Sequence, residues 1–305
     1  MTIEWSPLDD YQIIQKIGRG RYSDVFQGIN VKNNKFCAIK ILKPVRKSKI
    51  NREIKVLQNV SGGPNIVKLL DVCKDFSSET PSLIFEYLQN TDYHFLFKNF
   101  GDMEIRNYLF QLLKALDHTH KNGIVHRDVK PVNVIYEART SEMRLVDWGL
   151  ADFYFPGKEF NVRVSTRFFK APELLMQYRH YHYSLDMWSL GCMMAGMKEP
   201  FFKGIDDDDQ FSKIMRKFSQ TELSQYIRRY DITPSKQIEQ VLTRSTPTDW
   251  SRYVNKNNSR LVSTEALNLL KKMLVLDHSD RLFAHEAIEH PYFDPVRNHV
   301  ARILD

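Results

Sequence analysis

Four side chains suited to proton transfer and metal binding lie within the twenty positions from Asp128 to Asp147. Lys130 and Asn133 follow Asp128 by two and five positions. A carboxylate can accept a proton from a hydroxyl, and carboxylate and amide oxygens bind Mg²⁺ beside phosphate oxygens. A lysine ammonium can neutralise charge on a phosphoryl group during transfer. These residue types suit phosphoryl transfer, with Asp128, Lys130 and Asn133 as candidate catalytic residues and Asn133 and Asp147 as candidate Mg²⁺ ligands.

A glycine-containing segment over residues 17–25 is predicted to bind the phosphates of a nucleotide. Glycine lets backbone N–H groups approach phosphate oxygens without a side-chain clash. Because a strand rather than a helix follows the glycines, the dinucleotide-binding pattern is excluded. A hairpin turn that uses glycine for backbone reasons alone is the alternative. The predicted nucleotide-binding residues here are Ile17, Gly18, Arg19, Gly20, Arg21, Tyr22, Ser23, Asp24 and Val25.

Lys40 and Glu53 form a second predicted part of the nucleotide site. Lys40 lies among apolar residues of a predicted strand, where burial without a partner is costly. Glu53 lies in the helix predicted next along the chain, where it can pair with Lys40. A lysine on a strand surface is the alternative when the pair is considered alone. The position of Lys40 after the glycine segment favours a phosphate contact.

The elements that must position these residues change character along the chain. Apolar and β-branched runs predict strands over residues 11–17, 25–29, 36–42 and 82–87, with a helix over 50–58. From residue 102 onward apolar residues recur at spacings of three and four, which predicts a helix over 104–122 that ends at Gly123. A strand-rich part followed by a helical part predicts a two-lobed α+β architecture. Such junctions often hold ligand clefts.

Composition limits the class of protein. The chain has 305 residues, of which 42% are hydrophobic and 27% charged, as in a soluble globular protein. No apolar run approaches the roughly 18 residues needed to span a bilayer, and no secretory signal begins the sequence. Three scattered cysteines argue against a disulfide framework. The net charge of +7 suggests an acidic partner, with generic surface lysine and arginine as the alternative.

Several motifs together resemble the eukaryotic protein kinase family over residues 11–293. They are His126-Arg127-Asp128 with Asn133, Asp147-Trp148-Gly149, Ala171-Pro172-Glu173 and the run from Asp186 to Gly191. The resemblance implies one protein kinase domain over 1–305, with an N-lobe over 11–87, a hinge over 86–91 and a C-lobe over 92–293. It implies a small β-rich N-lobe with one main helix and a larger helical C-lobe. It also implies a buried ion pair between Glu173 and Arg281, and nucleotide contacts from Ala38, Glu86, Leu88 and Ile135.

The segment 147–173 has few hydroxyl side chains at its middle, where many kinases carry an activating phosphate. Ser165 and Thr166 lie near its end, where they are expected to shape the substrate pocket. We therefore expect a segment that is ordered without phosphorylation. The indole N–H of Trp148 offers a hydrogen bond that phenylalanine lacks, and it can help to hold this segment.

Two basic groups predict acidic substrates. The first comprises Arg163, Arg167 and Lys170 near the end of the same segment, and the second comprises Arg46, Lys47, Lys49 and Arg52 at the helix of Glu53. A solvated helix face is the alternative for the second group. An acidic run over residues 206–209 is expected to be solvated surface.

Trp148, the basic group at Arg163 and segments in both lobes resemble the catalytic (alpha) subunits of the casein kinase II family, within the CMGC group. The resemblance implies an acidophilic Ser/Thr kinase that is active without phosphorylation of its activation segment and uses ATP, or GTP as an alternative, with Mg²⁺. It implies acidic protein substrates and a tetramer of two catalytic subunits on a dimer of regulatory beta subunits. In that family Arg163, Arg167 and Lys170 correspond to residues that select the position after the target hydroxyl, and Arg46, Lys47 and Lys49 to residues that select a later acid. The family occurs in nucleus and cytoplasm.

Three alternatives stay open at this point. A proline-directed kinase of the CMGC group would not need the trio at Arg163. A non-catalytic pseudokinase scaffold is disfavoured because Lys40, Glu53, Asp128, Asn133 and Asp147 are all present. Direct nucleic-acid binding rests on net charge alone, without a supporting motif, and is not expected.

Overall fold

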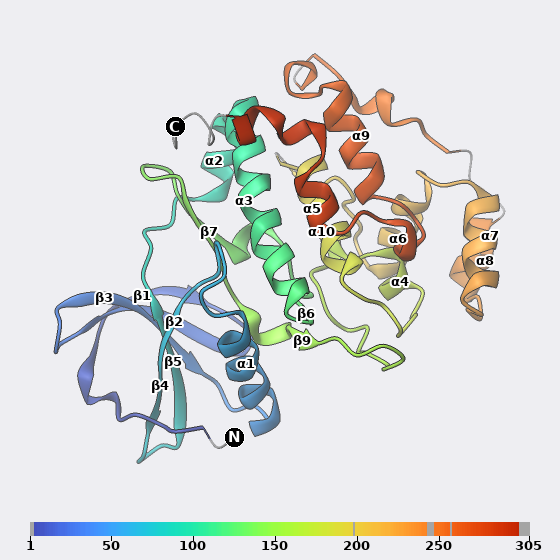
Figure 1. The fold of residues 1–305 in the computed structure, drawn as a ribbon. Coiled ribbons are helices and arrows are strands. Elements are labelled where there is room, and N and C mark those ends of the chain that lie inside the picture. Colours follow the sequence, from blue (N-terminus) through green and yellow to red (C-terminus); the bar gives the residue numbers. More distant parts are fainter. Residues whose placement is uncertain (1–2, 198, 243–246, 257, 299–305) are drawn as a thin grey trace. The chain divides into compact units, whose positions relative to one another are not determined.

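The computed structural model describes residues 3–197, 199–242, 247–256 and 258–298. The chain divides into two compact units (Figure 1). The first unit comprises Met1–Thr91 and Ile135–Gly149, and the second comprises Asp92–Val134 and Leu150–Asp305. Among the described residues, no helix combines the length and apolar character needed to cross a membrane.

A five-stranded antiparallel sheet forms most of the first unit, with the order β1-β2-β3-β5-β4. The register places Lys40 of β3 opposite Val25 of β2 and Leu83 of β5. Alternate residues of the strands bury a small apolar cluster that includes Cys37, Ile39, Cys73 and Ile84. The strands are β1 (Tyr11–Arg19), β2 (Ser23–Asn30), β3 (Lys35–Leu42), β4 (Leu69–Asp75) and β5 (Thr80–Glu86).

One α-helix, α1 (Lys47–Val60), accompanies this sheet in the described part of the first unit. Its buried face includes Ile50, Ile54 and Leu57, which follow the helical spacing of three and four, and also carries Glu53. The helix begins three residues before the predicted start because the apolar pattern is interrupted by the basic residues of its first turn. A short hairpin of β7 (Val134–Glu137) and β8 (Glu142–Leu145) leads to Asp147.

The second unit is mainly helical. Its longest helix, α3 (Asp102–Lys121), buries Tyr108, Leu112, Leu116 and other apolar residues along one face, and Gly123 follows it with a φ of +69°, which favours glycine. A larger core surrounds the fully buried Trp188 of α5. The other helices are α2 (Tyr93–Asn99), α4 (Pro172–Leu175), α5 (Ser184–Ala195), α6 (Asp207–Met215), α7 (Gln220–Arg229), α8 (Lys236–Leu242), α9 (Thr264–Met273) and α10 (Ala284–Ile288), and β6 (Ile124–Val125) pairs with β9 (Asp152–Phe153).

The expected α+β architecture is confirmed, with a β-rich unit that carries one main helix and a larger helical unit. The four predicted strands and the two predicted helices are present. Strand β4 and helix α2 were not predicted. The three cysteines are free and buried, in accord with the absence of a predicted disulfide framework.

Candidate active site

Lys40 lies between two carboxylates in the first unit. Its Nζ is 2.8 Å from Glu53 Oε1 and 2.9 Å from Asp147 Oδ1. The Lys40 side chain is 11% exposed and that of Glu53 is 7% exposed. Burial by itself would lower the pKa of Lys40, but the two carboxylates outweigh it and raise that pKa, so the ammonium form is held. The predicted pairing of Lys40 with Glu53 is present.

Asp147 adopts a backbone φ of +58°, which is uncommon for a residue other than glycine. Its side chain is half exposed although one oxygen is bound to Lys40. The following Trp148 is buried, and its indole Nε1 donates to Leu145 O over 3.3 Å. The extra hydrogen bond expected from Trp148 therefore exists, and it joins the residue to the end of β8.

The glycine segment forms the turn between β1 and β2. Gly20 N donates to Ser23 O over 2.8 Å, and Lys43 Nζ donates to Gly20 O over 2.8 Å. Asp24 pairs with Lys16 over 3.1 Å. Ile17, Gly18 and Arg19 lie on β1, Arg21 and Tyr22 lie in the turn, and Ser23, Asp24 and Val25 lie on β2. Residues 19–22 of this segment are exposed, whereas Ser23 is buried.

The other predicted nucleotide-binding residues also lie in the first unit. Ala38 lies on β3, Ile135 lies on β7, and Leu88 is half-buried just after β5. Glu86 ends β5, and its Oε1 accepts from Arg144 Nε over 2.8 Å and from Lys68 N over 2.9 Å. These contacts give the Glu86 carboxylate a structural role in joining β5, β8 and residue 68.

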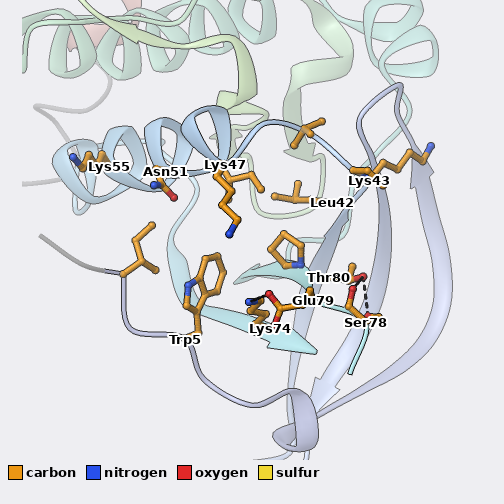
Figure 2. A pocket seen from close by; sticks show the side chains of 15 residues that line it. Trp5, Leu42, Lys43, Lys47, Asn51, Lys55, Lys74, Ser78, Glu79 and Thr80 are labelled. Carbon is orange, nitrogen blue, oxygen red and sulfur yellow. Dashed lines mark hydrogen bonds and ion pairs between the residues drawn. The ribbon is translucent and has the colours of Figure 1, made fainter. Parts of the chain in front are cut away.

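The second basic group lies at the N-terminus of α1. Arg46 precedes α1, and Lys47 and Lys49 lie in its first turn, which contains no acidic residue. Lys47 lines a surface cavity of about 540 Å³ together with Trp5, Lys74 and other residues. Figure 2 shows the Lys47 side chain extending from α1 toward Trp5. Lys49 Nζ instead lies 5.2 Å from the ring centre of Tyr22.

Asp128 is the centre of a hydrogen-bonded cluster in the second unit. Its Oδ2 accepts from Lys130 Nζ over 2.7 Å and from Asn133 Nδ2 over 3.0 Å. Its Oδ1 accepts from the Thr166 hydroxyl over 3.1 Å, and Lys130 Nζ lies 2.9 Å from the same hydroxyl. The three residues predicted to be catalytic are thus brought together, and Thr166 joins them.

The backbone that carries Asp128 is held by Asp186 of α5. The backbone N–H groups of His126 and Arg127 donate to the two Asp186 oxygens over 2.9 and 2.8 Å. His120 Nε2 lies 2.9 Å from Asp186 Oδ2. Burial raises the pKa of Asp186, but the hydrogen bond and charge of His120 outweigh it, so the net shift is downward. An ionised buried carboxylate therefore fixes the turn, in which Arg127 has a φ of +67°.

Arg127 has contacts for its whole guanidinium group within the second unit. Nε donates to Leu150 O over 2.6 Å, Nη2 donates to Asp152 over 3.0 Å, and Nη1 donates to the Tyr181 hydroxyl over 3.2 Å. The Tyr181 hydroxyl in turn donates to Asn161 O over 2.7 Å. The Arg127 side chain is 3% exposed, and these bonds tie it to three points of the chain after residue 149.

The residues of the first basic group are close together in the sequence. They are Arg163, Arg167 and Lys170. Arg163 is exposed, and no hydrogen bond or ion pair of its side chain is found among the described residues. Arg167 Nη1 donates to Ile205 O over 2.6 Å, and Lys170 Nζ lies 2.5 Å from Asp207 Oδ2. The acidic run over 206–209 was expected to be solvated surface only, but Asp207 is an ion-pair partner of a predicted substrate cation.

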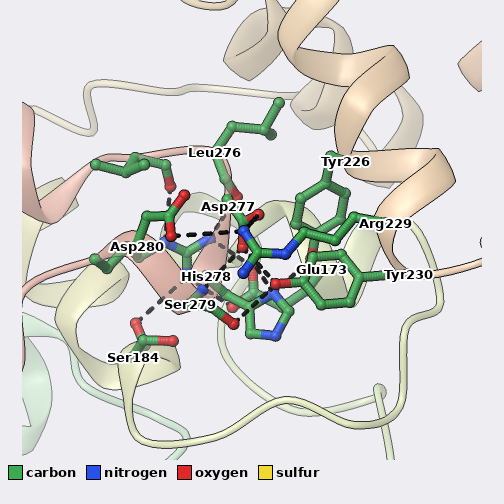
Figure 3. A network of polar contacts seen from close by, with 12 residues as sticks. Glu173, Ser184, Tyr226, Arg229, Tyr230, Leu276, Asp277, His278, Ser279 and Asp280 are labelled. Atoms are coloured by element: carbon green, nitrogen blue, oxygen red, sulfur yellow. Dashed lines mark hydrogen bonds and ion pairs between the residues drawn. The ribbon is translucent and has the colours of Figure 1, made fainter.

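Glu173 and Arg281 form the expected buried pair. The two terminal guanidinium nitrogens of Arg281 each lie 2.7 Å from a Glu173 oxygen, and both side chains are fully buried. Figure 3 shows Glu173 in a polar network with Asp277, Arg229 and Tyr230. This network joins Glu173, the last residue of the segment 147–173, to the end of α7 and to the turn at residues 277–280.

Sequence reasoning missed the contacts of Thr166 and Asp207. Thr166 lies 38 positions from Asp128 and Asp207 lies 37 positions from Lys170. No local pattern indicates such pairs, because they depend on how distant segments pack. The one signal that could have indicated a role for Thr166 was the position of its hydroxyl next to a predicted substrate cation, Arg167, in the sequence.

The side chains present suit a hard divalent cation. Asn133 Nδ2 donates to Asp128 O over 2.8 Å and also to Asp128 Oδ2, so its amide is oriented with the carbonyl oxygen as the remaining ligand atom. Asp147 offers a half-exposed carboxylate. Within the part of the chain that the structure describes, no group of three or more His, Cys, Asp or Glu could hold a metal. Each unit thus supplies one oxygen ligand of the kind that Mg²⁺ takes when phosphates and water complete its coordination.

The predicted site residues therefore form one set in each unit. The first unit holds the Lys40–Glu53–Asp147 cluster, the glycine turn and the basic group of α1, and the second holds the Asp128 cluster and the three later cations. A comparison with family models finds that the model described as protein kinase domain matches residues 11–293.

Proposed function

Because the chain belongs to the protein kinase family, we propose that it is a Ser/Thr protein kinase that prefers acidic substrates, like the casein kinase II catalytic subunits it resembles. Protein kinases transfer a phosphoryl group from ATP with the help of divalent metal ions. Mg²⁺ is the proposed ion, since it takes oxygen ligands and shares them with nucleotide phosphates. ATP is the proposed nucleotide, with GTP as an alternative.

The Asp128 cluster supports the proposed mechanism. Asp128 would orient the substrate hydroxyl and accept its proton, and Lys130 would neutralise charge on the transferring phosphoryl group. Lys130 Nζ is 2.7 Å from Asp128 Oδ2, so the charge and the proton acceptor are positioned together. Asn133 and Asp147 would hold Mg²⁺, which when bound neutralises charge on the nucleotide phosphates. Lys40, kept charged between Glu53 and Asp147, would contact the nucleotide phosphates.

One observation carries the proposed acidic preference. Thr166 binds Asp128, and the next residue in the chain is Arg167, followed by Lys170. A peptide whose hydroxyl reached Asp128 would therefore pass close to these cations. Arginine and lysine recognise carboxylate and phosphate through charge-assisted hydrogen bonds. A proline after the target hydroxyl would make no use of them.

The position of the second basic group also favours a ligand role. Positive charges near a helix N-terminus oppose the helix dipole and cost about 0.3–1 kcal/mol each. Lys47 and Lys49 occupy that position in α1 without an acidic neighbour in the first turn. They are therefore not placed to stabilise the helix. Recognition of an acidic residue further along the substrate accounts for them, as the resemblance implies.

The contacts of Arg127 support activity without phosphorylation of the segment 147–173. In many kinases this arginine binds an activating phosphate. Here its guanidinium already binds Leu150 O, Asp152 and Tyr181, and its side chain is almost fully buried. The chain's own groups thus take the place of a phosphate.

The proposed partners follow from the same resemblance. They are acidic proteins as substrates and a dimer of regulatory beta subunits that would complete a tetramer with two catalytic subunits. We propose a nuclear and cytoplasmic location on this ground. Gel filtration of the chain mixed with a beta subunit would test the assembly, since an unchanged elution volume would contradict it.

A peptide assay tests the proposed activity. Purified protein with Mg-ATP should phosphorylate a Ser peptide rich in Asp and Glu and leave a Ser-Pro peptide largely unmodified. Asp128→Asn should abolish turnover while nucleotide binding stays nearly unchanged, because Asp128 acts on the hydroxyl. The reverse peptide preference would contradict the acidophilic function, and nucleotide binding without any turnover by the wild type would favour a scaffold.

The cation trio can be tested in the same assay. Arg163→Ala with Arg167→Ala should raise KM most for peptides with an acid directly after the Ser. Two lost charge-assisted contacts at about 1.5–3 kcal/mol each predict a change of roughly a hundredfold or more. A uniform rise across all peptides would mean that the arginines only support the loop. Repeating the assay with GTP shows whether this nucleotide is used.

A further inference from the structure

Asp207 pairs with two of the three cations, Arg167 and Lys170. In the proposed function, these cations bind the acidic residue of the substrate. Asp207 Oδ2 lies 2.5 Å from Lys170 Nζ, and Asp207 Oδ1 lies 3.9 Å from Arg167 Nε. The Lys170 side chain is only 15% exposed. An anion that reaches Lys170 must therefore share it with Asp207 or displace Asp207.

The backbone around Asp207 holds the residue in this position. Asp206 caps α6 and accepts from Asp209 N over 2.7 Å, while Asp209 accepts from Ile205 N over 2.9 Å and pairs with Lys213 over 2.8 Å. Arg167 Nη1 donates to Ile205 O, so the same turn is joined to the segment 147–173. Asp207 is thus the first residue of a helix whose start is fixed by its neighbours.

Asp206 and Asp209 of this run have partners other than Lys170 and Arg167. Asp206 is used for capping and Asp209 for the pair with Lys213. The Asp207 side chain is 54% exposed, so solvent and a competing anion can reach it. A carboxylate held beside Lys170 in this way has the same chemistry as an Asp or Glu side chain of a substrate.

We propose that Asp207 is an internal competitor for the acidic residue that follows the target hydroxyl, and that it sets how strongly this position selects for acid. The inference rests on the proposed acidophilic function. Competition raises the KM for a peptide with a carboxylate at this position. A phosphorylated residue carries about −1.5 to −2 charges, so it displaces Asp207 more readily than a carboxylate does. Asp207 therefore shifts the preference from carboxylate toward phosphate.

Asp207→Asn tests the proposal because it removes the charge and keeps the size of the side chain. A partly exposed ion pair contributes about 1 kcal/mol at most, so the KM for a peptide with Asp after the Ser should fall roughly three- to fivefold. The KM for the matching peptide with Ala there, and kcat for both, should be unchanged. The advantage of phosphoserine over Asp at that position should shrink.

Two further variants separate this role from general electrostatics and from helix stability. Glu199→Gln removes one negative charge from an exposed pair with Lys203 in the same unit and should leave the selectivity unchanged. In a Lys170→Ala background, Asp207→Asn should have a smaller effect, because only the longer contact of Asp207 with Arg167 remains. A loss of thermal stability without a change in selectivity would assign Asp207 to helix α6 alone.

Fluorescence anisotropy with a peptide whose target Ser is Ala measures the same selectivity without turnover. If Asp207→Asn gains the same affinity for the peptide with an acid after the target residue as for the peptide with Ala there, the proposal is overturned. If the wild type prefers acid and Asp207→Asn leaves that preference unchanged, the competitor role fails while the proposed function stands. If neither the wild type nor Asp207→Asn distinguishes an acid from Ala at the position after the target residue, both the competitor role and the proposed function fail. If only Asp207→Asn distinguishes them, the competitor role is supported and Asp207 masks the site in the wild type.

Discussion

Arg281 binds both carboxylate oxygens of Glu173 over 2.7 Å, and neither side chain has any exposed surface. Arg281 also donates to three backbone carbonyl oxygens, those of Val275, Ser184 and Leu276. Its guanidinium lies 4.8 Å from the ring centre of Trp188, which belongs to the apolar core of the second unit. Glu173 is the last residue of the segment 147–173, which also carries Thr166 and Lys170, so this pair anchors that segment to the core of the second unit.

Glu173→Gln should therefore destabilise the protein strongly. Removing one partner leaves the Arg281 charge buried without its counter-ion, which costs about 3–5 kcal/mol. Urea unfolding should show a lower midpoint with an unchanged slope. Arg229→Met is the matched control, because Arg229 pairs with Asp277 at the surface of the same network and its loss should cost about 1 kcal/mol or less (Figure 3). Equal effects of the two substitutions would contradict the anchoring role.

His182 should make the fold sensitive to acid. Burial, and then the charge of His278, lower the pKa of His182 to about 4, and Ser184 N donates to its Nδ1 over 3.3 Å. Because the folded pKa lies below the unfolded value of about 6.5, the contribution is fully present above pH 6.5 and is lost as the pH falls toward 4. The loss should reach roughly 3 kcal/mol. Denaturation midpoints measured from pH 7 to pH 4 should fall accordingly.

His182→Asn should reduce this slope, since asparagine can still accept from Ser184 N but does not titrate. His285→Asn, at an exposed histidine, serves as the control for a change of surface histidine. An unchanged slope in His182→Asn would mean that other groups govern the acid sensitivity.

Trp148→Phe should remove the hydrogen bond to Leu145 O. A neutral hydrogen bond contributes about 1 kcal/mol, which corresponds to a shift of roughly 2–4 °C in Tm. If the bond also helps to position Asp147, the KM for Mg-ATP should rise with little change for the peptide. Thermal unfolding and ATP kinetics distinguish these effects. If the Tm and the KM for Mg-ATP are both unchanged, Trp148 contributes to the resemblance to the casein kinase II family but has no separate role.

Glu53→Gln should weaken nucleotide binding. Gln retains a hydrogen-bond acceptor but removes one of the two charges that hold the Lys40 ammonium. A charge-assisted hydrogen bond contributes about 1.5–3 kcal/mol, so the affinity for ATP should fall roughly tenfold to a hundredfold. Glu79→Gln is the control, because Glu79 pairs with Lys74 at the surface of the same unit. Calorimetric titration with ATP would measure both variants. If Glu53→Gln and Glu79→Gln bind ATP equally well, the Lys40–Glu53 pair has no role in nucleotide binding.

The sequence predicted the elements whose residues repeat a strong pattern. The strands that carry the glycine turn and Lys40 were predicted within two residues of their observed ends, because β-branched and apolar residues dominate them. Strand β4 was missed because Asp71, Lys74 and Asp75 interrupt its pattern. Helix α2 was missed because four of its seven residues are Tyr, His and Phe, which are not strong helix formers.

The candidate site was predicted where a motif fixes the spacing. Asp128, Lys130 and Asn133 lie within six positions, and the local turn alone brings them together. Asp152 and Tyr181 could not be predicted as partners of Arg127, because they lie 25 and 54 positions away. Such contacts depend on tertiary packing, which a single sequence does not reveal.

The ammonium group of Lys40 has three N–H bonds, and the structure assigns one to Glu53 and one to Asp147. Among the residues that the structure describes, no third acceptor is found for Lys40, so one N–H bond can donate to a further group. A phosphate oxygen can take it without breaking either existing bond, whereas a nucleoside without phosphates gains nothing from it. Under the proposed role, Lys40 would distinguish ADP and ATP from adenosine. Glu53→Gln should then leave adenosine affinity unchanged while weakening both nucleotides.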